Sequence, residues 1–233
     1  MEKDDFIQPK LNRTNLDIYF IRKSIFSAIE KNLLKFKGKV LDVGCGQMPY
    51  KNYLLENCDI REYIGLDIDN ALVYGDNIKP DMVWDGKIMP INDNEYDTII
   101  GTELLEHCYN PEITLAEIAR VLKPSGIFFF TTPFFWPLHE SPNDQFRYTP
   151  YSLKRILRDS GFKNIEIKAG GGWHASLAQM IGLWIMRSPI NKFQRKIFSF
   201  LAKPFMKILI YIDKDNSIRD QQMFTNLYGT AEK

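Results

Sequence analysis

An acid and two glycines follow a hydrophobic run in the stretch VLDVGCG, which ends at Gly46. Gly44 and Gly46 carry no Cβ, so their backbone can adopt positive φ values and a ligand can approach it closely. Asp42 precedes the glycines and Cys45 lies between them. Where a strand ends and a helix follows, main-chain N–H groups of the turn are expected to face the ligand. This spacing is typical of a turn that binds a nucleotide.

Two further acids follow hydrophobic runs downstream of this turn. Asp67, next to Ile68, ends the run YIGLD, and its carboxylate can accept hydrogen bonds from both hydroxyls of a ribose. Asp85, next to Gly86, follows the run MVW and is placed to accept a hydrogen bond from an adenine amino group. Pro49 stands where a dinucleotide-binding turn needs a third small residue. The pattern therefore favours an adenosine-containing ligand without a pyrophosphate and disfavours an NAD-dependent dehydrogenase.

Two histidines follow the next two hydrophobic runs and could act as general bases toward a hydroxyl nucleophile. His139 is the first candidate, because its loop is rich in proline and aromatic residues and is expected to cover the ligand crevice. His107 is the second. The alternatives are a His139 that only makes hydrogen bonds within its loop, and a Glu-His pair at 106–107 that only fastens its loop to its neighbours. His174, after three glycines, could line an acceptor pocket.

The elements that must position these residues alternate along the chain. Hydrophobic runs take turns with helical patterns, which predicts a parallel sheet with helices on both faces. Ligands bind such sheets beyond the carboxyl ends of the strands, where the candidate residues lie. Helices are expected over 14–36, about 49–57, 111–122 and 150–160, with start signals at Asn110-Pro111 and Thr149-Pro150. Strands are expected over 39–43, 63–67, 82–84, 97–101, 127–132, 163–168 and 223–230.

Five motifs in this order resemble class I S-adenosylmethionine-dependent methyltransferases, closest to the methyltransferase-11-like group: VLDVGCG, YIGLDID, EYDTIIGTELLEH, ARVLKPSG and FFFTTPF. The resemblance covers about residues 38–170, with Ser125 where the family usually has glycine. It implies a Rossmann-like, doubly wound, seven-stranded α/β sheet with an antiparallel last strand. It implies S-adenosylmethionine as the cofactor and S-adenosylhomocysteine as the product. The cofactor contacts that it implies are Asp42, Gly44, Cys45, Gly46, Asp67, Ile68, Asp85, Gly86, Thr102 and Glu103.

A metal is the alternative to a histidine base. Glu103, Glu106 and His107 are spaced i, i+3 and i+4, so one helical turn would place them on one side. The arrangement resembles the metal ligands of methyltransferases that act on RNA 3′-terminal ribose or on quinone precursors, and it would suit Mg²⁺. The further histidine of the RNA enzymes falls near Asp144 here and is absent, although His139 could substitute for it. We expect no metal, with Glu103 contacting the cofactor's methionine end or capping a turn.

The run from Pro137 to Pro150 resembles a subgroup associated with bacterial surface-polysaccharide assembly. The resemblance implies an O-methyltransferase whose acceptor is a sugar hydroxyl on a nucleotide or lipid carrier. Arg147 could pair with an acceptor phosphate, with Tyr148 beside it, or could instead brace the loop. The alternatives are a methyltransferase acting on RNA or on a quinone-like small molecule, and a non-catalytic subunit that binds the cofactor.

The stretch 173–212 contains no Asp or Glu but six cations. On a helical wheel five of these cations share one arc of about 120°, opposite Phe, Ile and Leu side chains. Such a helix can lie in a membrane interface, or its apolar side can cover its own domain or a dimer partner. Pro204 is expected to kink or split the helix. The cations are Arg187, Lys192, Arg195, Lys196, Lys203 and Lys207.

Length and composition suit one α/β domain, since the 233 residues are 45% hydrophobic and 25% charged. We divide it into a helical cap (1–37), a cofactor-binding core (38–172), a basic helical insertion (173–221) and a last strand (222–233). A net charge of +1 gives no reason to expect nucleic acid. Three scattered cysteines, no signal peptide and no apolar run long enough to span a bilayer predict a cytoplasmic protein. It could touch the inner membrane surface through 190–212 or form a homodimer.

Overall fold

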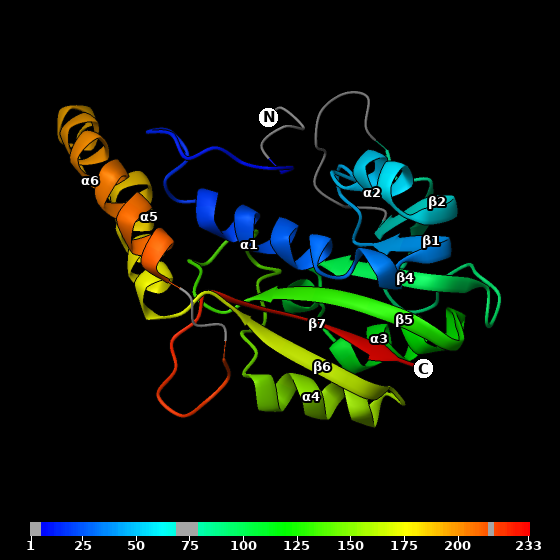
Figure 1. Cartoon of the computed structure of the whole chain (residues 1–233). Helices are drawn as coiled ribbons and strands as arrows, with labels where there is room; N and C mark the ends of the chain where they lie inside the picture. The colour runs from blue at the N-terminus through cyan, green and yellow to red at the C-terminus, as the bar shows by residue number, and fades with distance from the viewer. Residues whose placement is uncertain (1–5, 69–78, 214–216) are drawn as a thin grey trace.

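A seven-stranded sheet forms the centre of the computed structural model, which describes residues 6–68, 79–213 and 217–233 (Figure 1). The strand order is β3-β2-β1-β4-β5-β7-β6, and β7 runs antiparallel to both of its neighbours while the other pairs are parallel. The predicted doubly wound α/β sheet with an antiparallel last strand is confirmed. The strands are β1 (Lys37–Val43), β2 (Asp59–Ile68), β3 (Met82–Trp84), β4 (Tyr96–Thr102), β5 (Leu122–Pro133), β6 (Lys163–Gly170) and β7 (Asn226–Glu232).

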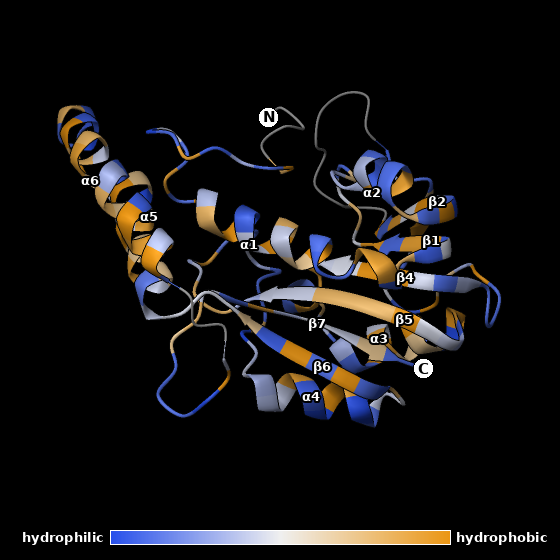
Figure 2. Cartoon of the chain, in the orientation of Figure 1, coloured by the Kyte–Doolittle hydropathy of each residue, from blue (hydrophilic) through white to orange (hydrophobic). Residues whose placement is uncertain are grey.

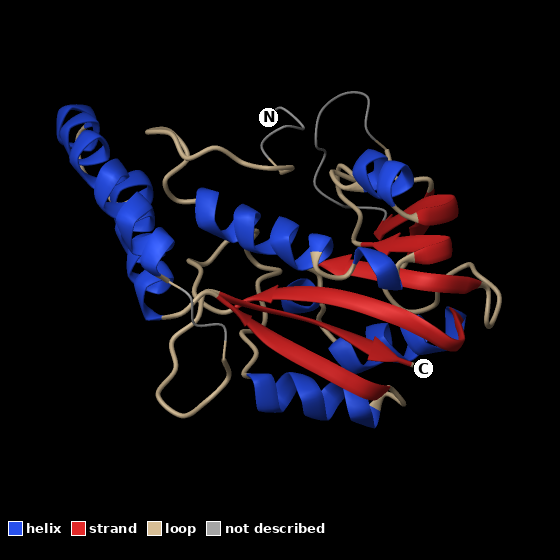
Figure 3. Cartoon of the chain, viewed as in Figure 1, coloured by secondary structure: helices blue, strands red, loops and turns tan. Residues whose placement is uncertain are grey.

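Helices cover both faces of the sheet, as the alternating pattern predicts (Figure 3). One core joins apolar side chains of α1 and α2 to one face, and a second core joins α3 and α4 to the other. The central strands read as continuous apolar runs because both faces are covered, and Phe128, Phe129 and Phe130 are all fully buried. These helices are α1 (Tyr19–Glu30), α2 (Lys51–Asn57), α3 (Pro111–Val121) and α4 (Pro150–Asp159).

Several expected boundaries differ from the structure. The helix expected over 14–36 is α1 followed by a short 3-10 helix, η2 (Leu33–Lys35). The last strand lies two to three residues later than 223–230. Thr149 caps α4 through a reciprocal bond pattern with Ser152, but Asn110 makes no side-chain cap on α3. Ser125, in the glycine position of its motif, adopts φ +62°, so this turn carries the backbone strain that glycine would avoid.

A helical hairpin follows β6 and projects from the end of the sheet where β6, β7 and α1 meet (Figure 1). It consists of α5 (Trp173–Arg187) and α6 (Lys192–Ile212). The helices pack on each other and on the segment before α1, where Leu16 is buried against Met206 and Leu209. α6 continues through Pro204 as one helix, so the expected split does not occur. Within the described residues, no helix is both long and apolar enough to cross a membrane.

The sheet and the helical hairpin differ in the hydropathy of their residues (Figure 2). The middle of β5 is apolar, whereas α6 alternates between hydrophobic and hydrophilic residues. The sheet core is therefore closed to solvent, and the hairpin is the part of the described chain where apolar side chains remain in contact with water in large number.

Candidate active site

The glycine turn after β1 has the backbone conformation that its sequence predicts. Gly44 adopts φ +67° and Gly46 adopts φ +48°. The N–H groups, however, do not face outward. Gly44 and Cys45 donate to the carbonyl of Leu66 at 2.9 and 3.2 Å, and Gly46 donates to Asp67 Oδ2 at 2.9 Å. The expectation of free N–H groups at this turn is wrong, because the end of the neighbouring strand β2 accepts all three.

Gly44 also has a steric requirement. A Cβ on Gly44 would lie 2.8 Å from Leu104 Cδ1, whereas a Cβ on Gly86, at φ +77°, would meet nothing within 4 Å. We expect Gly86→Ala to cost about 1 kcal/mol of unfolding free energy from backbone strain alone. Gly44→Ala should cost about 1 kcal/mol more, since Leu104 must move. Urea denaturation of the two variants measures the difference, and equal losses would contradict the steric argument.

Two acids lie at the carboxyl ends of adjacent strands, as predicted. Asp67 is the penultimate residue of β2, which pairs with β3, and Asp85 directly follows β3. Asp67 Oδ1 accepts from the N–H of Ile68, which complements the bond from Gly46 to Oδ2. Asp85 is exposed and accepts from the N–H groups of Lys87 and Ile88, and these bonds lower its pKa. Ile68 is 43% exposed at this edge and offers an apolar surface of the kind that a purine base covers.

Asp42 supports the turn from beneath instead of reaching its surface. Its side chain is buried, and the hydroxyl of Tyr63 donates to Asp42 Oδ2 at 2.7 Å. Burial raises the pKa of Asp42 from its ordinary 3.8 to about 7, although the bond from Tyr63 works in the other direction. Cys45 is also buried, and burial raises the pKa of its thiol. Both side chains therefore pack beneath the turn and do not reach its surface.

The raised pKa of Asp42 predicts a pH dependence. Its protonated form is the one that the fold tolerates, so its contribution to stability is complete below pH 3.8 and is lost as the pH rises through about 7. We expect Asp42→Asn to leave the unfolding free energy of the cofactor-free protein unchanged near pH 4. Near pH 8 the variant should be more stable than the wild type by on the order of 2–4 kcal/mol. Denaturation at the two pH values measures this, and an equal offset at both would contradict it.

The loop after β4 is fastened to the end of β5. Glu103 has an uncommon φ of +51°, its N–H donates to Thr131 O at 3.1 Å, and its Oε1 accepts from the Thr131 hydroxyl at 2.7 Å. Burial raises the pKa of Glu103 to about 7. Thr102, the last residue of β4, lies opposite Thr131 in the sheet. A strained acidic residue at a strand end is a feature of functional loops.

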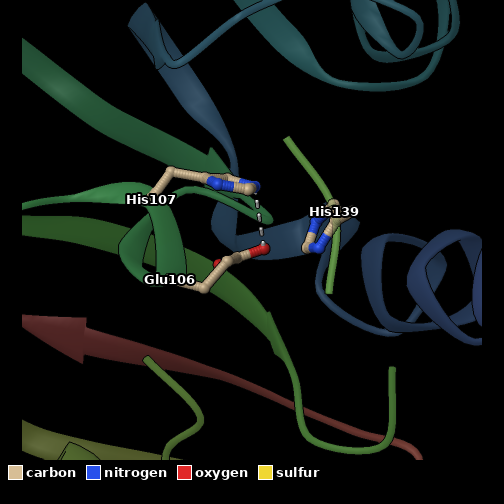
Figure 4. A group of neighbouring side chains, drawn as sticks. All are labelled: Glu106, His107 and His139. Carbon is tan, nitrogen blue, oxygen red and sulfur yellow. Dashed lines mark ion pairs between the residues drawn. The ribbon is translucent and has the colours of Figure 1, made fainter. Parts of the chain in front are cut away.

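Glu106, His107 and His139 form a cluster at this edge of the sheet (Figure 4). Glu106 and His107 lie in the 3-10 helix η3 (Leu105–His107), and His139 comes from the loop after β5. The two imidazole rings are 4.8 Å apart, and His107 Nε2 lies 3.8 Å from Glu106 Oε1. Glu106 is fully buried, and neither of its carboxyl oxygens has a hydrogen-bond partner among the described residues. Burial and the nearby Glu103 raise its pKa well above the ordinary range.

Both histidine rings are held through their Nδ1 atoms. His139 Nδ1 lies 3.1 Å from Asp144 Oδ2, and His107 Nδ1 lies 3.3 Å from the carbonyl of Asn143. Arg147 pairs with both oxygens of Asp144, at 2.5 and 2.8 Å, and lowers the pKa of this carboxyl to about 2. A carboxylate that accepts from Nδ1 fixes the tautomer whose Nε2 is a proton acceptor. His139 therefore has the geometry of an oriented base.

The same cluster contains the atoms that a metal would need, but the set differs from the expected one. Ligand atoms of Glu106, His107 and His139 lie within 4.8 Å of one another. Glu103 is absent from this set, because its positive φ precedes η3 and Thr131 holds its carboxylate. The one-turn arrangement expected from the i, i+3 and i+4 spacing is therefore wrong.

The three predicted acceptor residues lie in different surroundings. Arg147 makes all its described bonds to the loop 136–146, so it braces that loop. Tyr148 is buried in the core and donates to the carbonyl of Leu105, which places it beneath η3 and away from an acceptor. His174 is exposed in the first turn of α5, outside the cluster. Tyr148 is thus a support for the site.

Three residues of the site lie outside the candidates that the sequence provides: Tyr63, Thr131 and Asp144. Each holds a candidate residue in place. Tyr63 bonds to Asp42, Thr131 bonds to Glu103, and Asp144 bonds to His139. Asp144 could have been found from the sequence, since an acid five residues from a histidine in one loop can reach its ring. No sequence pattern indicates Tyr63 or Thr131, because their contacts depend on which strands lie side by side in the sheet.

Comparison with known proteins shows similarity to methyltransferases. Residues 41–130 match the family model of a methyltransferase domain. A Mycolicibacterium smegmatis protein, named a probable S-adenosylmethionine-dependent methyltransferase, is 29% identical over 60% of this chain and 58% of its own length. Demethylmenaquinone methyltransferase of Staphylococcus carnosus is 26% identical over 67% of this chain and 79% of its own length. The chain thus spans little more than half of the mycobacterial relative.

Solved structures show the same fold. A methyltransferase of Archaeoglobus fulgidus, described as dependent on S-adenosylmethionine, superposes with a TM-score of 0.56 at 18% identity and covers 93% of this chain and 100% of its own. A Haemonchus contortus phosphoethanolamine N-methyltransferase, solved with S-adenosylhomocysteine, has the same TM-score at 14% identity; the match covers 100% of this chain and 61% of its own. Residues 41–130 are therefore similar to a methyltransferase domain, and the chain has the fold of S-adenosylmethionine-dependent methyltransferases.

Proposed function

We propose that this chain is a class I S-adenosylmethionine-dependent methyltransferase and that it transfers the methyl group to a hydroxyl of a sugar or glycan intermediate. The observation that carries the proposal is the pair formed by His139 and Asp144, at the edge of the sheet where the cofactor turn also lies. A hydroxyl is a weak nucleophile until its proton is removed, and an oriented imidazole is suited to this task.

The cofactor supplies an electrophilic methyl group on a positively charged sulfur. We assign the adenosine end to Asp67, Asp85 and Ile68, because two acids and an apolar side chain converge there on the edge beyond β2 and β3. Gly44 and Gly46, both at positive φ, form the turn beside them. The methionine end then extends toward Thr102 and Glu103, where β4 ends. This orientation directs the methyl group toward the histidine cluster.

The transfer itself is a single displacement. The acceptor oxygen forms a bond to the methyl carbon while the carbon–sulfur bond breaks, and S-adenosylhomocysteine leaves. His139 Nε2 receives the proton of the hydroxyl, and Asp144 stabilises the imidazolium through Nδ1. Much of the rate comes from alignment of the three reacting atoms, with effective molarities that reach about 10⁵ M or more. We assign His107, whose ring contacts that of His139, and the buried Glu106 to the acceptor side of the site.

A glycan acceptor is supported by the loop run 137–150, whose resemblance is to enzymes of surface-polysaccharide assembly. The relative from Staphylococcus carnosus is named for a quinone precursor, so a quinone-like acceptor is the second candidate. We place the reaction in the cytoplasm, with the sugar on a nucleotide or lipid carrier.

Labelled methyl transfer distinguishes these acceptors. Purified protein would be incubated with methyl-labelled S-adenosylmethionine and, separately, nucleotide sugars, lipid-linked glycans, demethylmenaquinone or transfer RNA. We expect label in a sugar as an O-methyl ether, identified by mass spectrometry, and unchanged rates after treatment with EDTA. Label in the quinone or RNA alone would overturn the glycan proposal. A rate that EDTA abolishes and Mg²⁺ restores would assign Glu106, His107 and His139 to a metal instead of to a base.

A further inference from the structure

The outward side of α6 is apolar although it faces water. Eight large side chains on this helix are exposed, from 41% for Ile197 to 82% for Tyr211. The residues that α6 buries are Ser199, Met206, Leu209 and Ile210. On a helical wheel the exposed apolar set spans about 140° and lies opposite the buried set. The eight are Phe193, Ile197, Phe200, Leu201, Phe205, Ile208, Tyr211 and Ile212.

A row of lysines borders this apolar side. Lys192, Lys196, Lys203 and Lys207 fall within about 60° of the wheel, between the buried set and the exposed apolar set. Among the described residues none of the four takes part in an ion pair, whereas Arg187 of α5 is paired with Asp17. The hairpin has no carboxylate between 173 and 212 that could neutralise them.

A cavity of about 440 Å³ opens where the two features meet. It is lined by the cations Arg13 and Lys203 and by Phe200, Leu201 and Pro204 of α6. Arg13 comes from the segment before α1, so two distant parts of the chain bring positive charge to one apolar hollow. A phosphate group with an attached hydrocarbon chain has the matching chemistry, since its charge meets the cations and its chain meets the apolar lining.

We propose that the outward side of α6 docks on an anionic phospholipid surface, with a lipid phosphate near Arg13 and Lys203. The alternative occupant, a second copy of this chain, is less suited to the charges. A two-fold interface brings the same patch of both copies together. Lysine rows would then share the interface with no acid on either hairpin to pair with them. An anionic leaflet supplies that negative charge and an apolar layer beneath it. The inference is independent of the acceptor that is methylated.

Vesicle flotation of the full chain tests the proposal. We expect binding to vesicles of phosphatidylcholine with 30% phosphatidylglycerol at low salt, and weak binding to phosphatidylcholine alone. Lys203→Gln/Lys207→Gln should weaken binding about 30-fold, because two cations leave the surface. Phe200→Ser/Phe205→Ser/Ile208→Ser should remove it. Arg13→Gln should weaken it less than the lysine pair.

Lys154→Gln/Arg155→Gln is the matched control, since it removes two cations from exposed positions on α4. It should leave flotation unchanged, and all variants should keep the wild-type far-ultraviolet circular dichroism and affinity for S-adenosylhomocysteine. Failure of the wild type to float with anionic vesicles would overturn the proposal, as would an equal loss in the α4 control. A wild-type dimer that the serine variant converts to a monomer, without vesicle binding in either, would assign the surface to a second copy.

Discussion

Replacing His139 by alanine is expected to lower kcat for methyl transfer by about 10²–10⁴-fold, the usual contribution of a positioned general base. The ring is held by Asp144, so its loss removes the proton acceptor without removing the carboxylate that is paired with Arg147. Affinity for S-adenosylhomocysteine should be unchanged, because the cofactor residues lie at the ends of other strands. Steady-state kinetics and titration calorimetry measure the two quantities.

Added imidazole should restore part of the lost rate, because a free base can enter the space left by the side chain. His174→Ala is the control, since it removes an exposed imidazole outside the cluster and should keep the wild-type kcat. A His139→Ala protein with full activity would remove the base from the mechanism. Lost activity together with lost cofactor affinity would instead show that the residue is needed to hold the site's shape.

Asp67→Ala is expected to weaken binding of S-adenosylmethionine by about 1.5–3 kcal/mol, or roughly 10- to 150-fold in Kd. Two causes act together. The ribose loses a charged acceptor, and the N–H groups of Gly46 and Ile68 lose the carboxylate that fixes them. Titration calorimetry measures the change.

Asp59→Ala provides the comparison, because Asp59 is exposed and lies at the amino end of the same strand, away from the carboxyl ends where Asp67 lies. Its Kd should equal that of the wild type. An Asp67→Ala protein that binds the cofactor as tightly as Asp59→Ala would show that another group receives the ribose.

The conformation of the glycine turn and the position of the acids at strand ends could be predicted from sequence, because each of these signals is local. The two glycines with positive φ, and the acids that end neighbouring strands, are encoded within a few residues of each other. The seven-stranded, doubly wound sheet and its antiparallel last strand were implied by the family resemblance, whereas the strand order comes from the structure. The direction of the N–H groups at the turn was wrong, since their acceptors Leu66 and Asp67 belong to another strand.

The acceptor side depends on contacts between loops that are far apart in sequence. Glu103 was assigned to a helical turn from its spacing, but Thr131 of β5 holds it in a left-handed conformation. His139, and not Glu103, lies next to Glu106 and His107. No periodicity in the sequence indicates this contact, because His139 comes from a different loop.

The sequence also could not predict which side of α6 is buried, because both sides of its helical wheel contain apolar residues. One determinant is a glycine of α5. A Cβ on Gly182 would clash with the carbonyl oxygen of Leu16, so the lack of a side chain there lets α5 pack closely against the segment before α1. Met206 and Leu209 of α6 belong to the same buried cluster as Leu16.

The position of β7 between β5 and β6 has a consequence for the order of folding. β6 reaches the rest of the sheet only through β7, whose residues 226–232 are synthesised after the whole hairpin. During synthesis, α5 and α6 therefore emerge while β6 still lacks its partner strand β7. Pairing of β7 joins segments about 100 residues apart, such as Phe129 with Thr230, and closure of such long loops is slow. The apolar helices are thus exposed to chaperones, or to a nearby bilayer, before the catalytic domain is complete.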